Sequence, residues 1–243
     1  MSITRPVVNA GLSYVNGLNL TWASVTTLTA AAGQCRDSSG VNDIDVDSAL
    51  TLDVDLSGAG GLDQGSMANN TIYAIYVVGS SYGAADPVLI CSTDHSSPLM
   101  PFNYDMHRRI GFFRSDGSAE ILPFYQVGES SQRWMYYDAS IATDITAGSS
   151  AVYADVDCTG SVPLINTIIE LDCSFDPTAG DDELVVVPNG STSANGLNRM
   201  SGSAAGVTKI GHMTCPCQGD ATLEYKVTGS AVALNVQGYL DNL

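Results

Sequence analysis

Residues 104–126, YDMHRRIGFFRSDGSAEILPFYQ, contain two short apolar runs, IGFF and ILPF, on either side of an Asp-Gly pair. Apolar runs that flank Asp116-Gly117 predict a β-hairpin, because glycine accepts the positive φ that a tight turn between strands requires. Pro123 has no N–H to donate to a ladder, so we expect it at a strand end or a sheet edge. The stretch therefore predicts antiparallel β structure.

The same stretch carries three of the nine basic residues of the chain, Arg108, Arg109 and Arg114. Buried charges are usually paired, so we expect Arg108 and Arg109 to form half-buried ion pairs beside Asp105 in the hairpin. Contact with an acidic neighbouring subunit is the alternative interpretation.

The clearest periodicity of the chain follows upstream, at residues 43–56. Apolar side chains fall on even positions and acidic or hydroxyl side chains between them. A period of two with one acidic face predicts one or two half-buried antiparallel strands with one face in water. The apolar positions are Ile44, Val46, Leu50, Leu52, Val54 and Leu56.

Further strands follow at short intervals, and residues 71–78, TIYAIYVV, are apolar on both faces, which predicts a central strand. Gly229-Ser230 predicts a second hairpin, residues 176–180 a third, and Asn16-Gly17 an alternative early one. Residues 189–206 read as a long low-complexity loop. The other strand-like segments are residues 18–29, 88–91, 133–137, 151–158, 162–171, 183–187, 207–214, 221–228 and 231–240.

Residues 139–148 are the one segment that could form a short helix, so the pattern predicts an all-β fold with little helix. We expect an antiparallel, jelly-roll-like β-sandwich with long loops. In domain terms, residues 1–18 are expected to form an N-terminal arm and residues 19–243 the sandwich. Two β domains that divide near residue 140 are the alternative.

The composition is 44% hydrophobic and 14% charged, with a net charge of −17. An acidic chain does not neutralise phosphates, so nucleic acid is not an expected partner. The N-terminus lacks the apolar core of a secretory signal and no apolar run approaches the length of a membrane span, so we expect assembly in a cytoplasm and no membrane partner. The six cysteines are then expected to be reduced and buried.

Three motifs resemble functional sites without completing them. His212-x-x-Cys215-Pro-Cys217 has zinc-like ligands but a tighter Cys spacing than zinc sites use, so buried thiols are favoured over zinc or redox chemistry. Asp43, Asp45 and Asp47 begin like a calcium loop that then lacks the glycine and glutamate of that pattern. Ser81 in GSSYG lacks the helix that a hydrolase nucleophile requires. No motif places the histidines at 95, 107 and 212, and the sequence assigns no catalytic residue, metal ligand or cofactor.

Several segments together resemble a pattern that recurs in structural proteins of tailed bacteriophages, namely head decorations, head fibres and tail appendages. The resemblance covers roughly residues 20–126, a little under half of the chain, and it carries no catalytic residues. Its segments are Leu20-Thr21-Trp22, Gly33–Ser38, Asn42-Asp43-Ile44, Gly60–Gly65, Ile75–Gly79, Tyr104-Asp105, Arg108–Gly111, Asp116-Gly117 and Ile121–Phe124.

The resemblance implies a non-enzymatic virion structural protein, first of all a capsid decoration or cement protein. Its implied partners are further copies of itself, in a homotrimer, and the major capsid protein or other virion proteins. The alternative is a tail or head fibre component that acts in tail assembly or binds host-surface glycans. A carbohydrate-active enzyme or lectin on the same fold is a third hypothesis, and it predicts carboxylates and exposed aromatic side chains gathered in one place.

Overall fold

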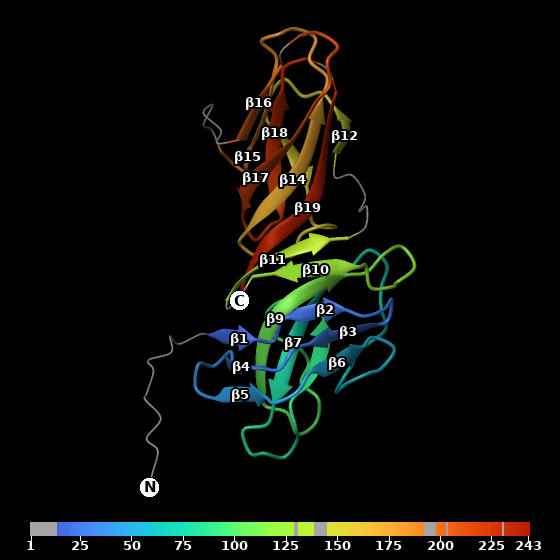
Figure 1. The fold of residues 1–243 in the computed structure, drawn as a ribbon, viewed down its shortest axis with the longest axis vertical. Coiled ribbons are helices and arrows are strands. Elements are labelled where there is room, and N and C mark those ends of the chain that lie inside the picture. The colour runs from blue at the N-terminus through green and yellow to red at the C-terminus, as the bar shows by residue number, and fades with distance from the viewer. Residues whose placement is uncertain (1–13, 129–130, 139–144, 192–197, 203, 230) are drawn as a thin grey trace.

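The computed structural model describes residues 14–128, 131–138, 145–191, 198–202, 204–229 and 231–243. Nineteen β-strands and no helix occur in these residues, and all pairings between the named strands are antiparallel. Two lobes are stacked along the long axis, with β1–β9 in the lower lobe and β12–β19 in the upper lobe (Figure 1). The expected all-β antiparallel sandwich is thereby confirmed.

The first layer of the lower lobe is a bent three-stranded meander. One register runs from Gly17 opposite Gly33 to Leu20 opposite Ala30, so the first four strands form a single long hairpin. Its two arms approach so closely at the bend that a Cβ on Gly17 would lie 2.5 Å from the carbonyl oxygen of Ala32. The strands are β1 (Val15–Gly17), β2 (Leu20–Trp22), β3 (Thr27–Ala30) and β4 (Gly33–Arg36).

The third arm of the meander is formed by residues 43–53, which belong to the segment with the clearest alternation of apolar and polar residues. It forms two strands, β5 (Asp43–Val46) against β4 and β6 (Leu50–Asp53) against β3. Ile44, Val46, Leu52 and Val54 are buried, whereas Leu56 is 52% exposed because the chain has already turned away. The predicted two-residue period is therefore confirmed up to Val54.

The second layer of the lower lobe has β7 (Ile72–Gly79) between β8 (Val88–Ser92) and β9 (Met106–Arg114). Every residue of β7 is buried, as its apolar sequence predicts. A bulge in β9 brings Gly111 against the first layer, where a Cβ would lie 2.6 Å from Cδ1 of Leu20. The absence of a side chain at Gly111 thus lets the two layers close.

The hairpin expected around Asp116-Gly117 is wrong in its pairing. Strand β9 pairs with β7, while β10 (Phe124–Val127) pairs with β2 and β11 in the other layer. Only Ser115 and Ile121 form a bridge across the turn. The Asp116 carboxylate accepts hydrogen bonds from two backbone amides of the turn, and the positive φ falls on Ala119, not on Gly117. The stretch is a crossing from one layer to the other.

The upper lobe is a second pair of facing sheets. One sheet contains β11 (Gln132–Tyr137), β12 (Ile145–Gly148), β14 (Thr167–Phe175), β17 (Lys209–Cys217) and β19 (Val232–Asn242). The opposite sheet contains β13 (Ala154–Asp157), β15 (Glu183–Pro188), β16 (Asn198–Ser201) and β18 (Thr222–Val227). Alternate residues of β14, β18 and β19 are buried between these sheets, which makes a separate core for this lobe.

The other expected hairpins are wrong in the same way, because the strands on either side of each turn do not pair with each other. The segments around residues 176–180 become β14 and β15, and those around Gly229 become β18 and β19, yet in both cases the two strands lie in opposite sheets. Near Asn16-Gly17 the chain likewise continues past the turn, and β1 pairs with β4.

Other sequence expectations are partly covered by the described residues. In the expected arm, residues 1–13 lie outside the described residues and residues 15–17 form β1. In the expected helical segment, residues 139–144 lie outside them and residues 145–148 form β12, a strand. The expected loop 189–206 includes β16, and its residues 192–197 and 203 are also outside.

One sheet continues through both lobes, in the order β17-β14-β19-β11-β10-β2-β3-β6 with β12 beside β19. Where the lobes meet, Nη1 of Arg109 in β9 lies 2.6 Å from Oδ1 of Asp241 in β19. Arg133 of β11 is also fully buried at the junction of the lobes, and its guanidinium donates to the carbonyl oxygens of Gly17 and Leu18. A shared ladder and buried charged groups therefore join the lobes into one body.

Candidate binding face at the junction of the lobes

The outer surface of the long sheet presents an aromatic and apolar cluster where the two lobes meet. Direct strand pairing places Tyr125 opposite Tyr136 and Val127 opposite Trp134, and paired residues share one side of a sheet. Tyr125 is 58% and Val127 54% exposed. We call this surface the junction face, and it consists of Tyr125, Val127, Gln132, Trp134, Tyr136, Ile168, Glu170, Thr214, Pro216, Leu240 and Asn242.

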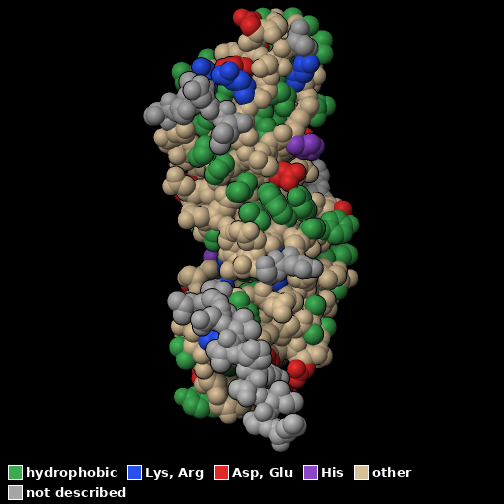
Figure 2. Space-filling view, turned by 60° about the vertical axis from the view of Figure 1, so that its left-hand side comes forward, with side chains coloured by type: hydrophobic (Ala, Val, Ile, Leu, Met, Phe, Trp, Pro, Cys, Tyr) green, Lys and Arg blue, Asp and Glu red, His purple; other side chains and the backbone are tan. Residues whose placement is uncertain are grey.

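Figure 2 shows hydrophobic side chains gathered at mid-height of the molecule, below a histidine and an acidic side chain of the upper lobe. The rings of Trp134 and Tyr136 are nearly parallel, with an interplanar angle of 16° and centroids 5.8 Å apart. They are two residues apart on β11, so the alternation of the strand brings both to this side. The centre of the junction face is therefore aromatic.

Tyr136 extends across a whole strand to reach its partner. Its hydroxyl donates to Oε2 of Glu170 at 3.0 Å, although β19 lies between their strands. Gly238 occupies the intervening position, where a Cβ would lie 2.8 Å from Cδ1 of Tyr136. The missing side chain at Gly238 is thus what lets the Tyr136 ring lie over the sheet.

The tyrosines of the junction face are fixed by carboxylates. The Tyr125 hydroxyl donates to Oδ2 of Asp138 at 2.9 Å, and this hydrogen bond raises the pKa of Tyr125. The pKa of Tyr136 is raised by burial and by its hydrogen bond to Glu170. Both hydroxyls are therefore protonated at neutral pH, and they hold Asp138 and Glu170 beside the aromatic rings.

Amide side chains border the opposite side of the aromatic centre. Nε2 of Gln132 donates to Oδ1 of Asn242 at 3.3 Å. Asn242 also lines a hollow of about 560 Å³ together with Asn166 and Gln218, and Ile168 and Pro216 of the junction face form part of its wall. The aromatic centre thus has carboxylates on one side and an amide-lined hollow on the other.

His212, Cys215 and Cys217 do not form a ligand cluster, and the favoured interpretation of Cys215 and Cys217 as buried thiols is confirmed. His212 is exposed on the outer side of β17, 3.9 Å from Asp172, while both thiols are buried on the inner side. The spacing of three and five residues places the histidine and the cysteines on opposite faces of the strand. Burial raises the pKa of Cys215 to about 12 and that of Cys217 to about 11, so both thiols are protonated.

The remaining cysteines are also buried, which confirms the expected burial of all six. Asp43 of the calcium-like run pairs with Arg36, with Nε and Oδ1 2.7 Å apart, and Asp45 accepts from Gln34. Asp47 is exposed, so the three aspartates lie on the solvent-facing side of β5 and of the residues after it. Across the described residues, no three His, Cys, Asp or Glu side chains are grouped so that they could hold a metal ion.

Ser81 is a turn residue. It follows β7, its hydroxyl donates to Asp105, and its amide donates to the same carboxylate at 2.7 Å. The ion pair expected between Asp105 and Arg109 is therefore wrong in its partner, because Asp105 closes the turn after β7. The carboxylate that Arg109 contacts is Asp241, 132 residues along the chain.

Two histidines lie against aromatic rings in the lower lobe. His95 packs edge-on against Phe112 and His107 against Tyr76. Burial lowers the pKa of both imidazoles, so they are neutral at pH 7. These contacts account for them as packing residues.

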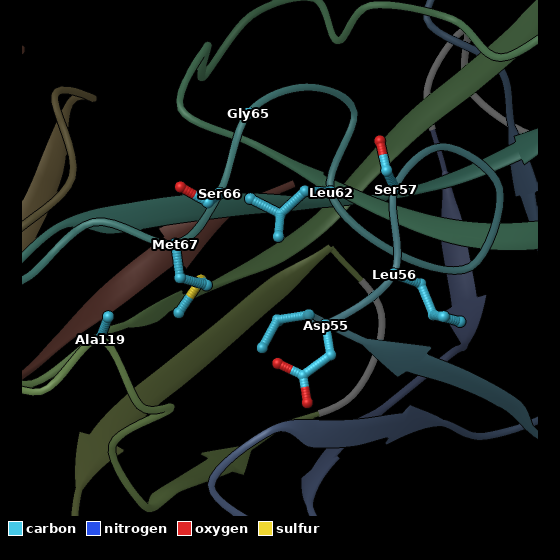
Figure 3. Close-up of a pocket in the computed structure, with 9 residues that line it drawn as sticks. Asp55, Leu56, Ser57, Leu62, Gly65, Ser66, Met67 and Ala119 are labelled. Carbon is cyan, nitrogen blue, oxygen red and sulfur yellow. The ribbon is translucent and has the colours of Figure 1, made fainter.

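A hollow of about 320 Å³ lies between the loop after β6 and the turn at Ala119. Figure 3 shows Leu62 between Ser57 and Ser66, with Asp55 below them, so the polar atoms do not point toward one another. This hollow is a gap between loops that brings no reactive groups together.

No family model matches the chain, and no curated protein matches it. Among solved structures, the chain is similar to one from the structure of infectious bursal disease virus Gx strain, at 13% identity, with 94% of this chain and 66% of that chain covered. The TM-score of 0.15 does not establish a shared fold, so the fold rests on the sheet topology described above. The described residues contain no helix that is long and apolar enough to cross a membrane.

The junction face could not be found from the sequence. Its members come from five strands, which are spread over residues 124–242 of the chain, and each strand contributes two or three of them. The alternation in RWMYY was the one local signal for it, because it predicts that the rings of Trp134 and Tyr136 share a side.

Proposed function

We propose that the chain is a non-enzymatic structural protein of a virus particle, a capsid decoration or cement protein that acts through subunit contacts. The observation that carries the proposal is the continuous sheet that makes two lobes into one elongated body. The resemblance to tailed-phage structural proteins supports it, since its segments fall on the meander, on β7 and on the crossing from β9 to β10.

The end of the lower lobe that lies away from the upper lobe suits attachment to a capsid (Figure 1). Tyr82 is 88% and Phe102 90% exposed, on the two loops that flank β8. The loops are tied together, because the Tyr104 hydroxyl donates to the carbonyl of Asp86 and Ser81 donates to Asp105. Exposed aromatic side chains on fixed loops are typical anchors of protein interfaces.

In this proposal the loops that carry Tyr82 and Phe102 contact the major capsid protein, and three copies of the chain assemble into a trimer. A stable contact needs more than about 1,000 Å² of buried surface in total, which neighbouring copies supply together. The chain is assembled onto the particle in the host cytoplasm, and its acidic surface keeps the free protein soluble.

The test is the copy number of the chain in purified particles, measured by quantitative mass spectrometry against the major capsid protein. Hundreds of copies support a decoration protein. A few dozen or fewer contradict the decoration role and favour the tail or fibre alternative. Absence from the particle overturns the proposal.

A second experiment tests the attachment site. Particles that lack the protein are mixed with the Tyr82→Ser/Phe102→Ser variant, and bound protein is counted after sedimentation. We expect binding to fall at least about tenfold, as loss of aromatic anchors predicts. The control is Val152→Ser, which changes a side chain of the upper lobe that is 71% exposed. Equal loss in the control would contradict attachment through this end.

A further inference from the structure

We infer that the junction face is a binding site for a neutral oligosaccharide of equatorially substituted pyranose units. Such sugars have apolar C–H faces and a rim of hydroxyl groups, which both donate and accept hydrogen bonds. The site therefore requires aromatic rings, carboxylate acceptors and amides side by side. The inference is independent of capsid attachment, because Tyr82 and Phe102 are not part of this face.

The aromatic requirement is met by three rings from two neighbouring strands. Tyr125 is largely exposed, and the parallel rings of Trp134 and Tyr136 lie beside it. Tyrosine and tryptophan offer large contact areas with few rotatable bonds, so little conformational entropy is lost on binding. The hydroxyl bonds to Asp138 and Glu170 fix both tyrosines further before a ligand arrives.

The polar requirement is met on both sides of the rings. The Tyr125 and Tyr136 hydroxyls each use one carboxylate oxygen, and an ionised carboxylate accepts about four hydrogen bonds. Asp138 and Glu170 therefore keep acceptor capacity for sugar hydroxyls. On the other side, the amides of Gln132, Asn242 and Asn166 offer both donors and acceptors next to the 560 Å³ hollow.

The charges of the face select the class of ligand. No lysine or arginine belongs to the junction face, and the basic residue of β11, Arg133, is buried on the other side of the sheet. Anionic ligands such as phosphate groups or nucleic acid would meet Glu170 and Asp138 without a counter-charge. A basic peptide would also use the rings and the carboxylates, and the titration below tests it against the saccharide. A neutral saccharide uses all three kinds of group.

The decisive experiment is isothermal titration of the full chain with cellohexaose and with hexa-N-acetylchitohexaose, two neutral β-1,4-linked hexasaccharides whose ring substituents are equatorial. We expect saturable binding of at least one of them, with a change in Trp134 fluorescence. Tyr125→Ala should weaken it about tenfold, the scale of one aromatic contact. The matched control is Tyr82→Ala, which removes an exposed tyrosine at the other end and should leave the affinity unchanged.

Glu170→Gln provides a second variant that keeps the size of the side chain while removing a charged acceptor, and it should also weaken binding. Circular dichroism and the midpoint of thermal unfolding establish that each variant is folded. No binding of either hexasaccharide would overturn the inference, and so would binding that Tyr125→Ala and Glu170→Gln leave unchanged. Binding of hexa-arginine in place of the sugars, lost in Tyr125→Ala, would also overturn it and assign the face to basic peptides.

Discussion

Replacement of Asp241 by alanine tests whether the buried charges at the junction hold the two lobes together. The Asp241 side chain is fully buried, and its Oδ1 lies 2.6 Å from Nη1 of Arg109, whose side chain is 16% exposed. Removal of the carboxylate leaves Arg109 and the buried Arg133 without this counter-charge. Breaking a buried ion pair by loss of one partner costs about 3–5 kcal/mol.

The lower end of that range is expected here, because Arg109 keeps two other contacts. Its Nη2 donates to the carbonyl of Asn242 at 2.9 Å, and its guanidinium lies over the Phe112 ring at 4.5 Å from the centroid. A loss of about 3 kcal/mol corresponds to a decrease of about 6–12 °C in the midpoint of thermal unfolding for a chain of this size. Differential scanning calorimetry and urea unfolding followed by tryptophan fluorescence measure both quantities.

A double replacement separates the charge from the packing. Burial raises the pKa of Asp241 despite the attraction of Arg109, Arg133 and Arg108, so the attraction does not fully offset the desolvation of the carboxylate. Arg109→Met combined with Asp241→Leu should therefore recover the part of the stability loss in Asp241→Ala that arises from Arg109, while the part that arises from the buried Arg133 remains. The control Asp55→Ala, at an exposed site, should change stability by less than about 0.5 kcal/mol. An Asp241→Ala protein as stable as this control would show that the Arg109–Asp241 pair does not hold the lobes together.

Three further predictions concern packing, acid stability and thiols. Gly111→Ala should cost about 1–3 kcal/mol in urea unfolding because its Cβ would meet Leu20, whereas Gly117→Ala, with no contact below 4.0 Å, should be nearly neutral; equal effects would contradict this. Burial acts to raise the pKa of Asp37, but hydrogen bonds from Ser39 and neighbouring amides outweigh burial and lower this pKa. The ionised Asp37 therefore stabilises the fold above the ordinary pKa of about 3.9, and this stabilisation is lost as the pH falls through the pKa of Asp37 in the folded protein. Hydrogen bonds likewise lower the pKa of other turn carboxylates, namely Asp94, Asp105, Asp116, Asp157, Asp182 and Asp220. Because burial also lowers the pKa of His95 and His107, the unfolding free energy should begin to fall as the pH drops below about 6.5 and should fall further below about pH 4, and a rise below about pH 4 would contradict this. The buried cysteines should react with a thiol reagent at pH 8 only after unfolding in urea, and fast reaction of the native protein would refute their burial.

Most strand positions could be predicted from the sequence, because the direction of a side chain on a strand depends on local geometry. The alternation of residues 43–54 and the apolar run before Gly79 correctly indicated which faces are buried. The turns at Asp116 and Gly229 were also correctly located. Their local sequences favour a reversal of the chain, whichever strand pairs with the next one.

The candidate site was much less predictable than the strands. The spacing of His212, Cys215 and Cys217 resembles a ligand set, but the pleat of β17 places the histidine on one face of the strand and the cysteines on the other. Sequence proximity suggested a pair between Asp105 and Arg109, which the fold replaces with Asp241. The junction face combines side chains of five strands, so no window of the sequence contains it.

By itself, then, the sequence determined an acidic, all-β chain, the positions of most strands and the face of each that avoids water. These properties follow from composition and from the two-residue period of a strand. The strand partners, in contrast, could be read only from the folded molecule, because pairing depends on how the layers cover one another's apolar faces. This pairing turned the expected hairpins into crossings between sheets, and it brought Tyr125, Tyr136 and Glu170 together on one exposed face.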